Sequence, residues 1–155
     1  DIGRCNGLAL DVEHHVLFAA CASSGGAPGE PPKPVMVILS ATNGHIITTL
    51  PLAGGSDGMV FNPATQEAFA TLGNGILEVV KESSPTSFAI EQELPTMNGA
   101  RTITLDRKTN HVFTMSFERG PAPPPSAEPA GGRSGRYGRM GPMIPGSFTI
   151  LMIGK

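Results

Sequence analysis

The chain has 155 residues, of which 20 are Gly, 15 are Pro and only 39% are hydrophobic, so long helices are not expected. No run approaches the 18 or so apolar residues of a transmembrane helix, and the first residues lack the basic and apolar regions of a signal peptide. Lys and Arg number 11 against 13 Asp and Glu, a balance that does not predict a polyanionic partner.

Short β-branched or apolar runs alternate with turn signals along the chain, which indicates strands. In chain order the clearest runs are Leu8–Asp11, Val16–Ala19, Val35–Leu39, Ile46–Leu52, Met59–Asn62, Leu77–Val80, Phe88–Leu94, Ile103–Asp106 and Phe148–Leu151. Asn43-Gly44 predicts a two-residue hairpin turn, because a type I′ turn needs positive φ at both central positions. Gly73-Asn74-Gly75 is interpreted as another hairpin turn. Sustained 3.6-residue periodicity is absent, so the predicted fold class is all-β and antiparallel.

Gly and Pro concentrate in two predicted inserts, residues 22–34 and 118–146. The second contains Gly132–Gly141, where Gly-Arg recurs every three residues. This pattern is typical of arginine-glycine segments that contact RNA. With three arginines, one tyrosine and no folded nucleic-acid module, we interpret it as a soluble, flexible insert and expect no nucleic-acid partner.

The strands follow an internal repeat. Asp11, Asn62 and Asp106 end equivalent strands, at spacings of 51 and 44 residues, and a Phe follows each after seven residues: Phe18, Phe69 and Phe113. A third strand follows in every repeat and a fourth in the first two. Four-stranded units at this spacing are typical of β-propeller blades. We therefore predict three blades and about eleven strands, with blades over about 5–52, 57–95 and 100–155 in a single domain 1–155.

Each repeated Asp or Asn is expected to start the turn between the first two strands and to bind nearby backbone N–H groups. Each repeated Phe is expected to fill the space between adjacent sheets. The alternative fold is a β-sandwich, because sandwiches also show strands at regular spacing.

Gly7–Asp11 with Val16–Phe18, Gly58–Pro63 and Gly146–Leu151 resemble the YVTN-type β-propeller repeat family, which is similar to surface-layer and cytochrome d1-like propellers. The resemblance covers the chain outside the two inserts. It implies a bacterial protein of the periplasm or of secreted type, and a whole propeller of six or seven blades. Three blades without a last outer strand correspond to the C-terminal half, since the N-terminal segment supplies that strand in the family. Members are binding scaffolds, lactonase-like enzymes or cofactor carriers.

Three polar residues stand five positions before the repeated Asp or Asn, where each innermost strand begins: Asn6, Asp57 and Arg101. Strand direction places both inserts and the segment Pro95–Arg101 on this same face. Because innermost strands converge on the central channel, we predict a ligand-binding site formed by Asn6, Asp57, Asn98 and Arg101. The alternative is that these residues only cap the turns that lead into the strands.

Catalytic signatures are weak. Gly54-Gly-Ser56-Asp-Gly58 matches a hydrolase nucleophile pattern, but a strand follows it instead of the required helix. His14, His15, His45 and His111 form no zinc-binding motif, and three of them fall near first-to-second-strand turns. A divalent cation such as calcium is chemically reasonable at Asp57 and Asn6, although a second carboxylate is missing.

We therefore expect no cofactor beyond such a cation, and a non-catalytic propeller scaffold that binds a protein, glycan or small molecule. The alternative function is a metal-assisted, lactonase-like hydrolase that uses the channel mouth near Asp57.

Cys5 and Cys21 are placed opposite one another by a simple hairpin centred near Glu13, which also pairs Leu8 with Phe18. An exported protein would form a disulfide there, and a cytosolic one would keep two buried thiols. The sequence leaves both open.

Three blades would leave apolar faces bare. We therefore expect a partner: a second copy that closes a six-blade ring, or a missing N-terminal half, with no membrane insertion.

Overall fold

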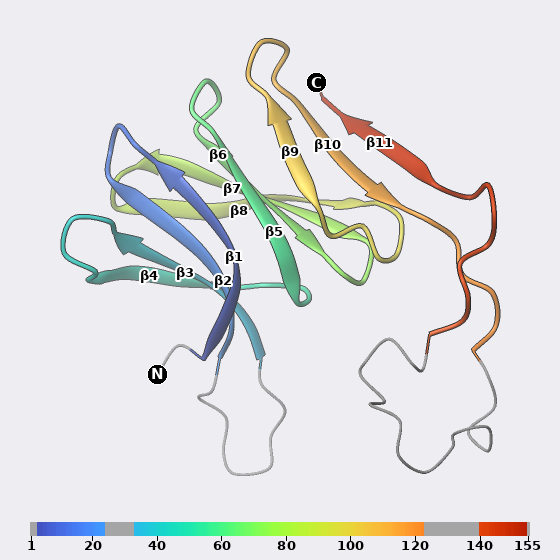
Figure 1. Cartoon of the computed structure of the whole chain (residues 1–155). Helices are drawn as coiled ribbons and strands as arrows, with labels where there is room; N and C mark the ends of the chain where they lie inside the picture. Colours follow the sequence, from blue (N-terminus) through green and yellow to red (C-terminus); the bar gives the residue numbers. More distant parts are fainter. Residues whose placement is uncertain (1–2, 24–32, 123–139, 155) are drawn as a thin grey trace. The chain divides into compact units, whose positions relative to one another are not determined.

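The computed structural model describes residues 3–23, 33–122 and 140–154 of the chain. Within these ranges there are eleven strands and no helix, which confirms the all-β, antiparallel prediction (Figure 1). The strands are β1 (Arg4–Asp11), β2 (Val16–Ser23), β3 (Lys33–Ser40), β4 (Ile46–Pro51), β5 (Ser56–Asn62), β6 (Glu67–Leu72), β7 (Ile76–Ser84), β8 (Ser87–Pro95), β9 (Ile103–Asp106), β10 (His111–Ser116) and β11 (Thr149–Ile153). None of the described residues belongs to a helix that could cross a membrane.

The strands form three sheets of consecutive strands: β1–β4 (blade 1), β5–β8 (blade 2) and β9–β11 (blade 3). By contacts the chain divides into two compact units. One holds Asp1–Ser116 with Ile150–Lys155 and so contains the blades, and the other is Phe117–Thr149. Both predicted inserts fall mainly on residues outside the described ranges, including most of the Gly-Arg segment.

The turn between the first two strands has the same construction in all three blades. The side-chain oxygen of the repeated Asp or Asn accepts the backbone N–H two residues on: Glu13 to Asp11 at 3.0 Å, Ala64 to Asn62 at 3.0 Å and Lys108 to Asp106 at 2.9 Å. The fourth residue after it has positive φ in every case: His15, Gln66 and Asn110. The predicted role of the repeated Asp or Asn is confirmed, because these Asx turns satisfy backbone donors that the hairpin leaves unpaired.

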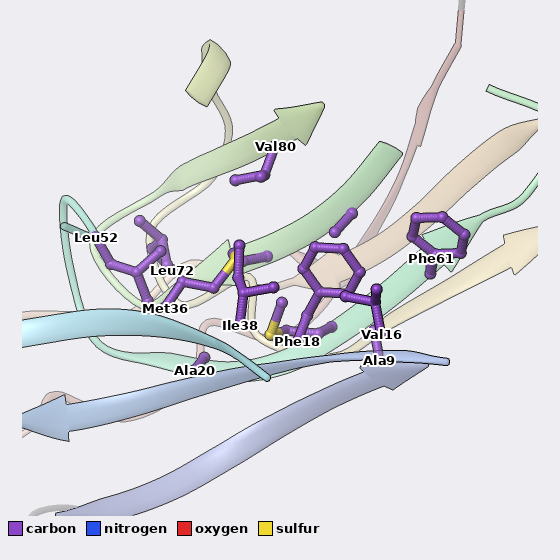
Figure 2. Close-up of a cluster of buried hydrophobic side chains, with 13 residues drawn as sticks. Ala9, Val16, Phe18, Ala20, Met36, Ile38, Leu52, Phe61, Leu72 and Val80 are labelled. Atoms are coloured by element: carbon purple, nitrogen blue, oxygen red, sulfur yellow. The ribbon is translucent and has the colours of Figure 1, made fainter. Parts of the chain in front are cut away.

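The sheets pack face to face through the repeated Phe. Phe18 is fully buried between blades 1 and 2, where its ring lies 5.4 Å from the Phe61 ring (Figure 2). The Phe18 ring also lies 5.7 Å from the Phe88 ring. Phe69 packs in the next core, with Val112 of β10 among its neighbours. Phe113 is the equivalent residue of blade 3 and stays half-buried. Phe18 and Phe69 therefore each face the blade that follows their own.

Consecutive innermost strands approach closely at glycines. A Cβ on Gly7 of β1 would lie 3.3 Å from the carbonyl carbon of Gly58 in β5. A Cβ on Gly58 would in turn lie 2.5 Å from the carbonyl oxygen of Arg101, just before β9. The first distance is tighter than most Cβ contacts and the second is too short for any Cβ, so glycine at these positions allows the innermost strands to approach closely.

Two details of hairpin register differ from the prediction. The turn after β3 is longer than two residues, since the Ser40 N–H donates to the His45 carbonyl and only Gly44 of the predicted pair has positive φ. In blade 1, Leu8 pairs with Ala19 and not with Phe18. The cause is a four-residue first turn, which shifts the register by one, followed by a β-bulge at Asn6, which shifts it back.

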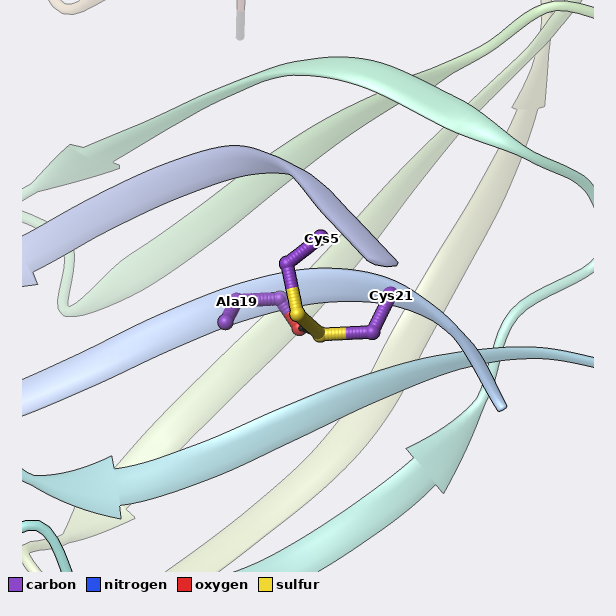
Figure 3. The surroundings of a disulfide bond; sticks show 3 residues. All are labelled: Cys5, Ala19 and Cys21. Atoms are coloured by element: carbon purple, nitrogen blue, oxygen red, sulfur yellow. Dashed lines mark hydrogen bonds between the residues drawn. A yellow bond between two sulfur atoms is a disulfide. The ribbon is translucent and has the colours of Figure 1, made fainter. Parts of the chain in front are cut away.

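The bulge brings Cys5 opposite Cys21, and the two form a disulfide between β1 and β2 (Figure 3). Cys21 is buried beside Ala19 and Val37, on the face of blade 1 that does not contact blade 2. The separation of 16 residues means that the bond removes loop-closure entropy from the unfolded chain. By the chain-entropy model a loop of this size contributes about 3 kcal/mol.

The described residues of the second unit hold a short bridge between Arg119 and Met143. The Arg119 guanidinium lies 4.7 Å from the centroid of the Phe117 ring and donates to the Gly141 carbonyl at 3.0 Å. Arg119 therefore ties the two sides of the insert together at its base.

Replacing Gly58 with Ala should destabilise the fold, because the new methyl group would push the Arg101 backbone away from β5. Overpacking of this kind costs about 1–3 kcal/mol. The control is Gly55→Ala, since a Cβ at Gly55 meets nothing within 4 Å. Chemical denaturation of both variants measures the effect, and equal stability of the two would contradict the close approach.

Candidate functional site

Two of the predicted site residues are the extra residues of β-bulges. The register shifts lie between Cys5 and Gly7 in β1 and between Ser56 and Gly58 in β5, so Asn6 and Asp57 occupy equivalent bulges of consecutive blades. A bulge leaves its extra residue outside the ladder and re-aims its side chain. Both side chains are exposed.

Asp57 and Arg101 form an ion pair that joins blades 2 and 3. Arg101 Nη1 lies 2.7 Å from Asp57 Oδ2, and both side chains are partly exposed. The Arg101 backbone is anchored, because its carbonyl accepts a hydrogen bond from the buried Thr71 hydroxyl. Gly73 leaves room for the guanidinium, since a Cβ there would lie 3.0 Å from Arg101 Nε.

Asn98 lies in the loop that leads to Arg101. Its carbonyl accepts a hydrogen bond of 2.6 Å from Ser116 Oγ, and its side chain is exposed. Among the described residues no hydrogen bond joins the Asn6 or Asn98 side chain to the ion pair of Asp57 and Arg101. Two of the four predicted site residues are thus brought into contact, with a donor and an acceptor side by side.

Ser56 has a local structural contact. It is buried at the start of β5, and its hydroxyl donates to the Gly58 carbonyl at 3.1 Å across the bulge. A strand follows it, as the sequence indicates, and not the helix of a nucleophile elbow.

A cluster that the sequence analysis missed lies at the other end of β1. Asp11 at the end of β1, His14 in the following turn and Glu82 of β7 bring their ligand atoms within 4.8 Å of one another. His14 Nδ1 lies 2.6 Å from Asp11 Oδ2 and 3.2 Å from Glu82 Oε1. The side chains of Asp11 and Glu82 are only 1% exposed, whereas that of His14 is 32% exposed.

Burial dominates the electrostatics of this cluster. It raises the pKa of Glu82 to about 7, and the negative charge of Asp11 adds to the increase while His14 opposes it. The hydrogen bond to Asp11 raises the pKa of His14. Neither oxygen of Glu82 accepts a hydrogen bond of normal geometry. The cluster therefore places two buried carboxyl groups around one imidazole nitrogen.

The signal for this cluster was present only in part. Asp11 and His14 are three residues apart in a turn, which the sequence shows directly. Glu82 follows the buried Val80 by two positions, so period-2 alternation puts it on the face toward blade 1. That this face meets the first turn of the preceding blade depends on blade packing, which the sequence does not specify.

A second buried carboxyl group holds the connection between blades 1 and 2. Glu78 of β7 is fully buried, and its Oε2 accepts the Ala53 N–H at 3.1 Å. Asn74 donates to the Ala53 carbonyl at 3.0 Å, so both backbone groups of Ala53 are bound. Burial raises the pKa of Glu78, the Ala53 N–H lowers it, and the charge of Glu93 raises it further. This site is structural.

Comparison with solved structures identifies the fold. A chain of the COPII outer coat vertex on membranes aligns with a TM-score of 0.60 and 12% identity over 74% of this chain and 32% of its own. The Neurospora crassa Pan2 WD40 domain aligns with a TM-score of 0.50 and 10% identity, covering 72% of this chain and 29% of its own. BamB from Moraxella catarrhalis aligns with a TM-score of 0.50 and 13% identity, covering 72% of this chain and 34% of its own.

WD40 repeats form four-stranded propeller blades, so the three sheets are blades of a β-propeller. The chain spans about a third of each of these structures and is a partial, unclosed propeller. At this level of identity the likeness shows the fold alone. No family model matches the sequence. No curated protein matches it either.

The ion pair of Asp57 and Arg101 should contribute little to stability, because both side chains are solvated. Exposed pairs of this kind contribute about 0.2–1 kcal/mol. A double-mutant cycle with Asp57→Asn and Arg101→Gln, followed by urea denaturation, should give a coupling energy in this range. A coupling energy of several kcal/mol would instead make the pair a structural clamp between blades 2 and 3.

Glu78 makes stability depend on pH. Because its pKa in the folded chain is raised above 4.5, the folded state binds more protons than the unfolded state above that pH. The free energy of unfolding therefore falls as pH rises. In Glu78→Gln this loss disappears, so the melting temperature of the variant should gain on that of the wild type as the pH is raised above 4.5. A constant difference across that range would contradict the raised pKa.

Proposed function

We propose that this chain is a binding scaffold whose three blades pack against further blades and present the starts of their innermost strands to a ligand. The observation that carries the proposal is that both outer flanks of the three-blade stack expose apolar side chains, although Ala19, Cys21 and Val37 on the flank of blade 1 are themselves buried. The equivalent sheet faces are buried where blade 1 packs on blade 2 and where blade 2 packs on blade 3.

The flank of blade 3 corresponds to the faces through which blades 1 and 2 contact the next blade. Val112 and Ile153 pack toward blade 2, so the residues that alternate with them face outward. The outward residues include Phe113, which is half-buried, and Ile150 and Met152, which are each 64% exposed. The repeated Phe has no following blade here.

The flank of blade 1 is apolar as well. Ala9 of β1 packs toward blade 2, whereas Leu8 and Leu10 point away from it and are 60% and 46% exposed. The disulfide lies on this same face. Exposed apolar sheet surface of this kind is typical of an interface.

A second copy of the chain is the partner that we propose. Each flank of one copy would meet the opposite flank of the other, and two copies would supply six blades, within the range of roughly four to eight that propellers use. Blade-to-blade packing already occurs twice within the chain, so the interface with a second copy would be formed by the same kind of apolar contact between sheets.

Closure would also complete the ligand site. The exposed Asn6, the ion pair of Asp57 with Arg101, and Asn98 belong to the starts of innermost strands and the loop before β9. A ring would surround them with the equivalent groups of the added blades. This donor and acceptor set suits a polar ligand, such as a glycan or a peptide.

The disulfide supports a location in an oxidising compartment such as the periplasm or the exterior. The YVTN-type resemblance of the repeat residues is consistent with that location and remains part of the proposal.

The proposal predicts that the purified chain sediments as a dimer at micromolar concentration. Ile150→Glu with Met152→Glu should shift it to monomer, because the charges would be buried in the new junction. The control is Val12→Glu, which also replaces an exposed apolar residue, at 68%, but lies in the turn between β1 and β2, outside the strands of both flanks.

Sedimentation velocity separates the outcomes. A wild-type chain that remains a monodisperse monomer would overturn association with a second copy. A dimer that the Val12→Glu variant disrupts, while the double Glu variant does not, would place the interface elsewhere.

A further inference from the structure

We propose that Asp11, His14 and Glu82 form a binding site for a divalent transition-metal ion of the Zn²⁺ class, which joins blade 1 to blade 2. The site is separate from the proposed ligand face, since Asp11 ends β1 and Asn6 lies near its start. It does not depend on the scaffold function.

The donor set is the first argument. One imidazole nitrogen and two carboxylates are ligands that Zn²⁺ accepts, whereas Ca²⁺ prefers oxygen ligands alone. Two ligand atoms about 2.0–2.1 Å from a tetrahedral ion lie about 3.4 Å apart. The distance of 3.2 Å from His14 Nδ1 to Glu82 Oε1 is close to this value. Asp11 Oδ2, now 2.6 Å from Nδ1, needs to move outward by less than 1 Å.

The state of Glu82 is the second and independent argument. Its side chain is buried and points at His14 and Asp11, yet neither of its oxygens accepts a hydrogen bond of normal geometry. His14 Nδ1, 3.2 Å away, is its ion-pair partner, and a buried carboxyl group with so weak a contact is costly, so a cation at this point would stabilise it. The metal would take the place of the proton on Nδ1, between the two carboxylates.

The repeat shows that the fold itself does not need these groups. The equivalent turn of blade 2 has Asn62 in place of Asp11 and Thr65 in place of His14. Asn62 makes the same hydrogen bond to the backbone, at 3.0 Å, with a single side-chain oxygen. In blade 1 that contact uses only Asp11 Oδ1, which orients the carboxylate and leaves Oδ2 available to the cluster.

The partial exposure of His14 provides access for the ion. With 32% of this side chain exposed, a fourth coordination position would open toward water. Three protein ligands and one open position are the usual form of a zinc site that can also bind an exchangeable ligand. Both cysteines of the chain are in the disulfide, so thiolates do not compete for the ion.

The experiment is a titration of the untagged chain with ZnCl₂ by calorimetry, with the absorption spectrum of added Co²⁺ as a second measurement. We expect one Zn²⁺ per chain and a Co²⁺ spectrum of low coordination number. His14→Thr and Asp11→Asn copy the residues of the blade 2 turn, so both variants should fold, and each should lower the affinity at least about tenfold. Glu82→Gln should do the same.

The matched control is His15→Asn. His15 adjoins His14 and has a φ of 55°, and Asn110 occupies the equivalent position in blade 3 at 60°, so the replacement keeps the turn. It should leave the affinity unchanged. Circular dichroism checks that each variant is folded.

Three results would overturn the proposal. The first is the absence of saturable binding at one Zn²⁺ per chain. The second is binding whose affinity is unchanged in His14→Thr and in Glu82→Gln, whatever the effect of His15→Asn. The third is saturable binding of Ca²⁺ where Zn²⁺ does not bind. Each of these results is independent of whether the chain dimerises.

Discussion

The packing of each blade on the next is the interaction on which the rest of this structure depends. An antiparallel sheet with two apolar faces is stable only when both faces are covered. Here Phe18 and Phe69 cover the forward faces of blades 1 and 2, and glycines such as Gly58 let the innermost strands approach closely enough for this contact. The same rule leaves the flank with Ile150 and Met152 without a neighbour. The packing of one blade on the next therefore determines the fold, the proposed association with a second copy, and the contact between blades 1 and 2 at which the proposed metal site lies.

Most of the fold was predictable because the repeat conserves residue types with a structural role and not only the spacing of apolar residues. Asp11, Asn62 and Asp106 bind the turn that follows them, and the position of the Phe fixes which face is buried. Register was less predictable. The bulge at Asn6 changes the pairing by one residue, and nothing in the local sequence distinguishes it from a regular strand. Cys5 and Cys21 meet because the bulge corrects the shift that the longer turn introduces.

The two candidate sites differ in how far the sequence could show them. Asp57 and Arg101 are equivalent positions of the repeat, so aligning the repeats places them at the same end of neighbouring strands. Glu82 is not related to Asp11 by the repeat. The two meet because a third strand of one blade packs beside the first turn of the blade before it. Such a contact appears only once the sheets are stacked, so sequence reasoning placed His14 near a turn but predicted no metal site there.

The repeat also separates what the fold requires from what this chain has added. All three first turns need one side-chain oxygen and one residue of positive φ, and Asn62 with Gln66 is sufficient for both. Only the turn of blade 1 combines a carboxylate with a histidine and faces a buried carboxyl group of the next blade. Removing charged groups from water is costly unless they gain partners. The first turn of blade 2 folds with the neutral Asn62, so the charged groups at the first turn of blade 1 are not required for folding. We infer that they have another role.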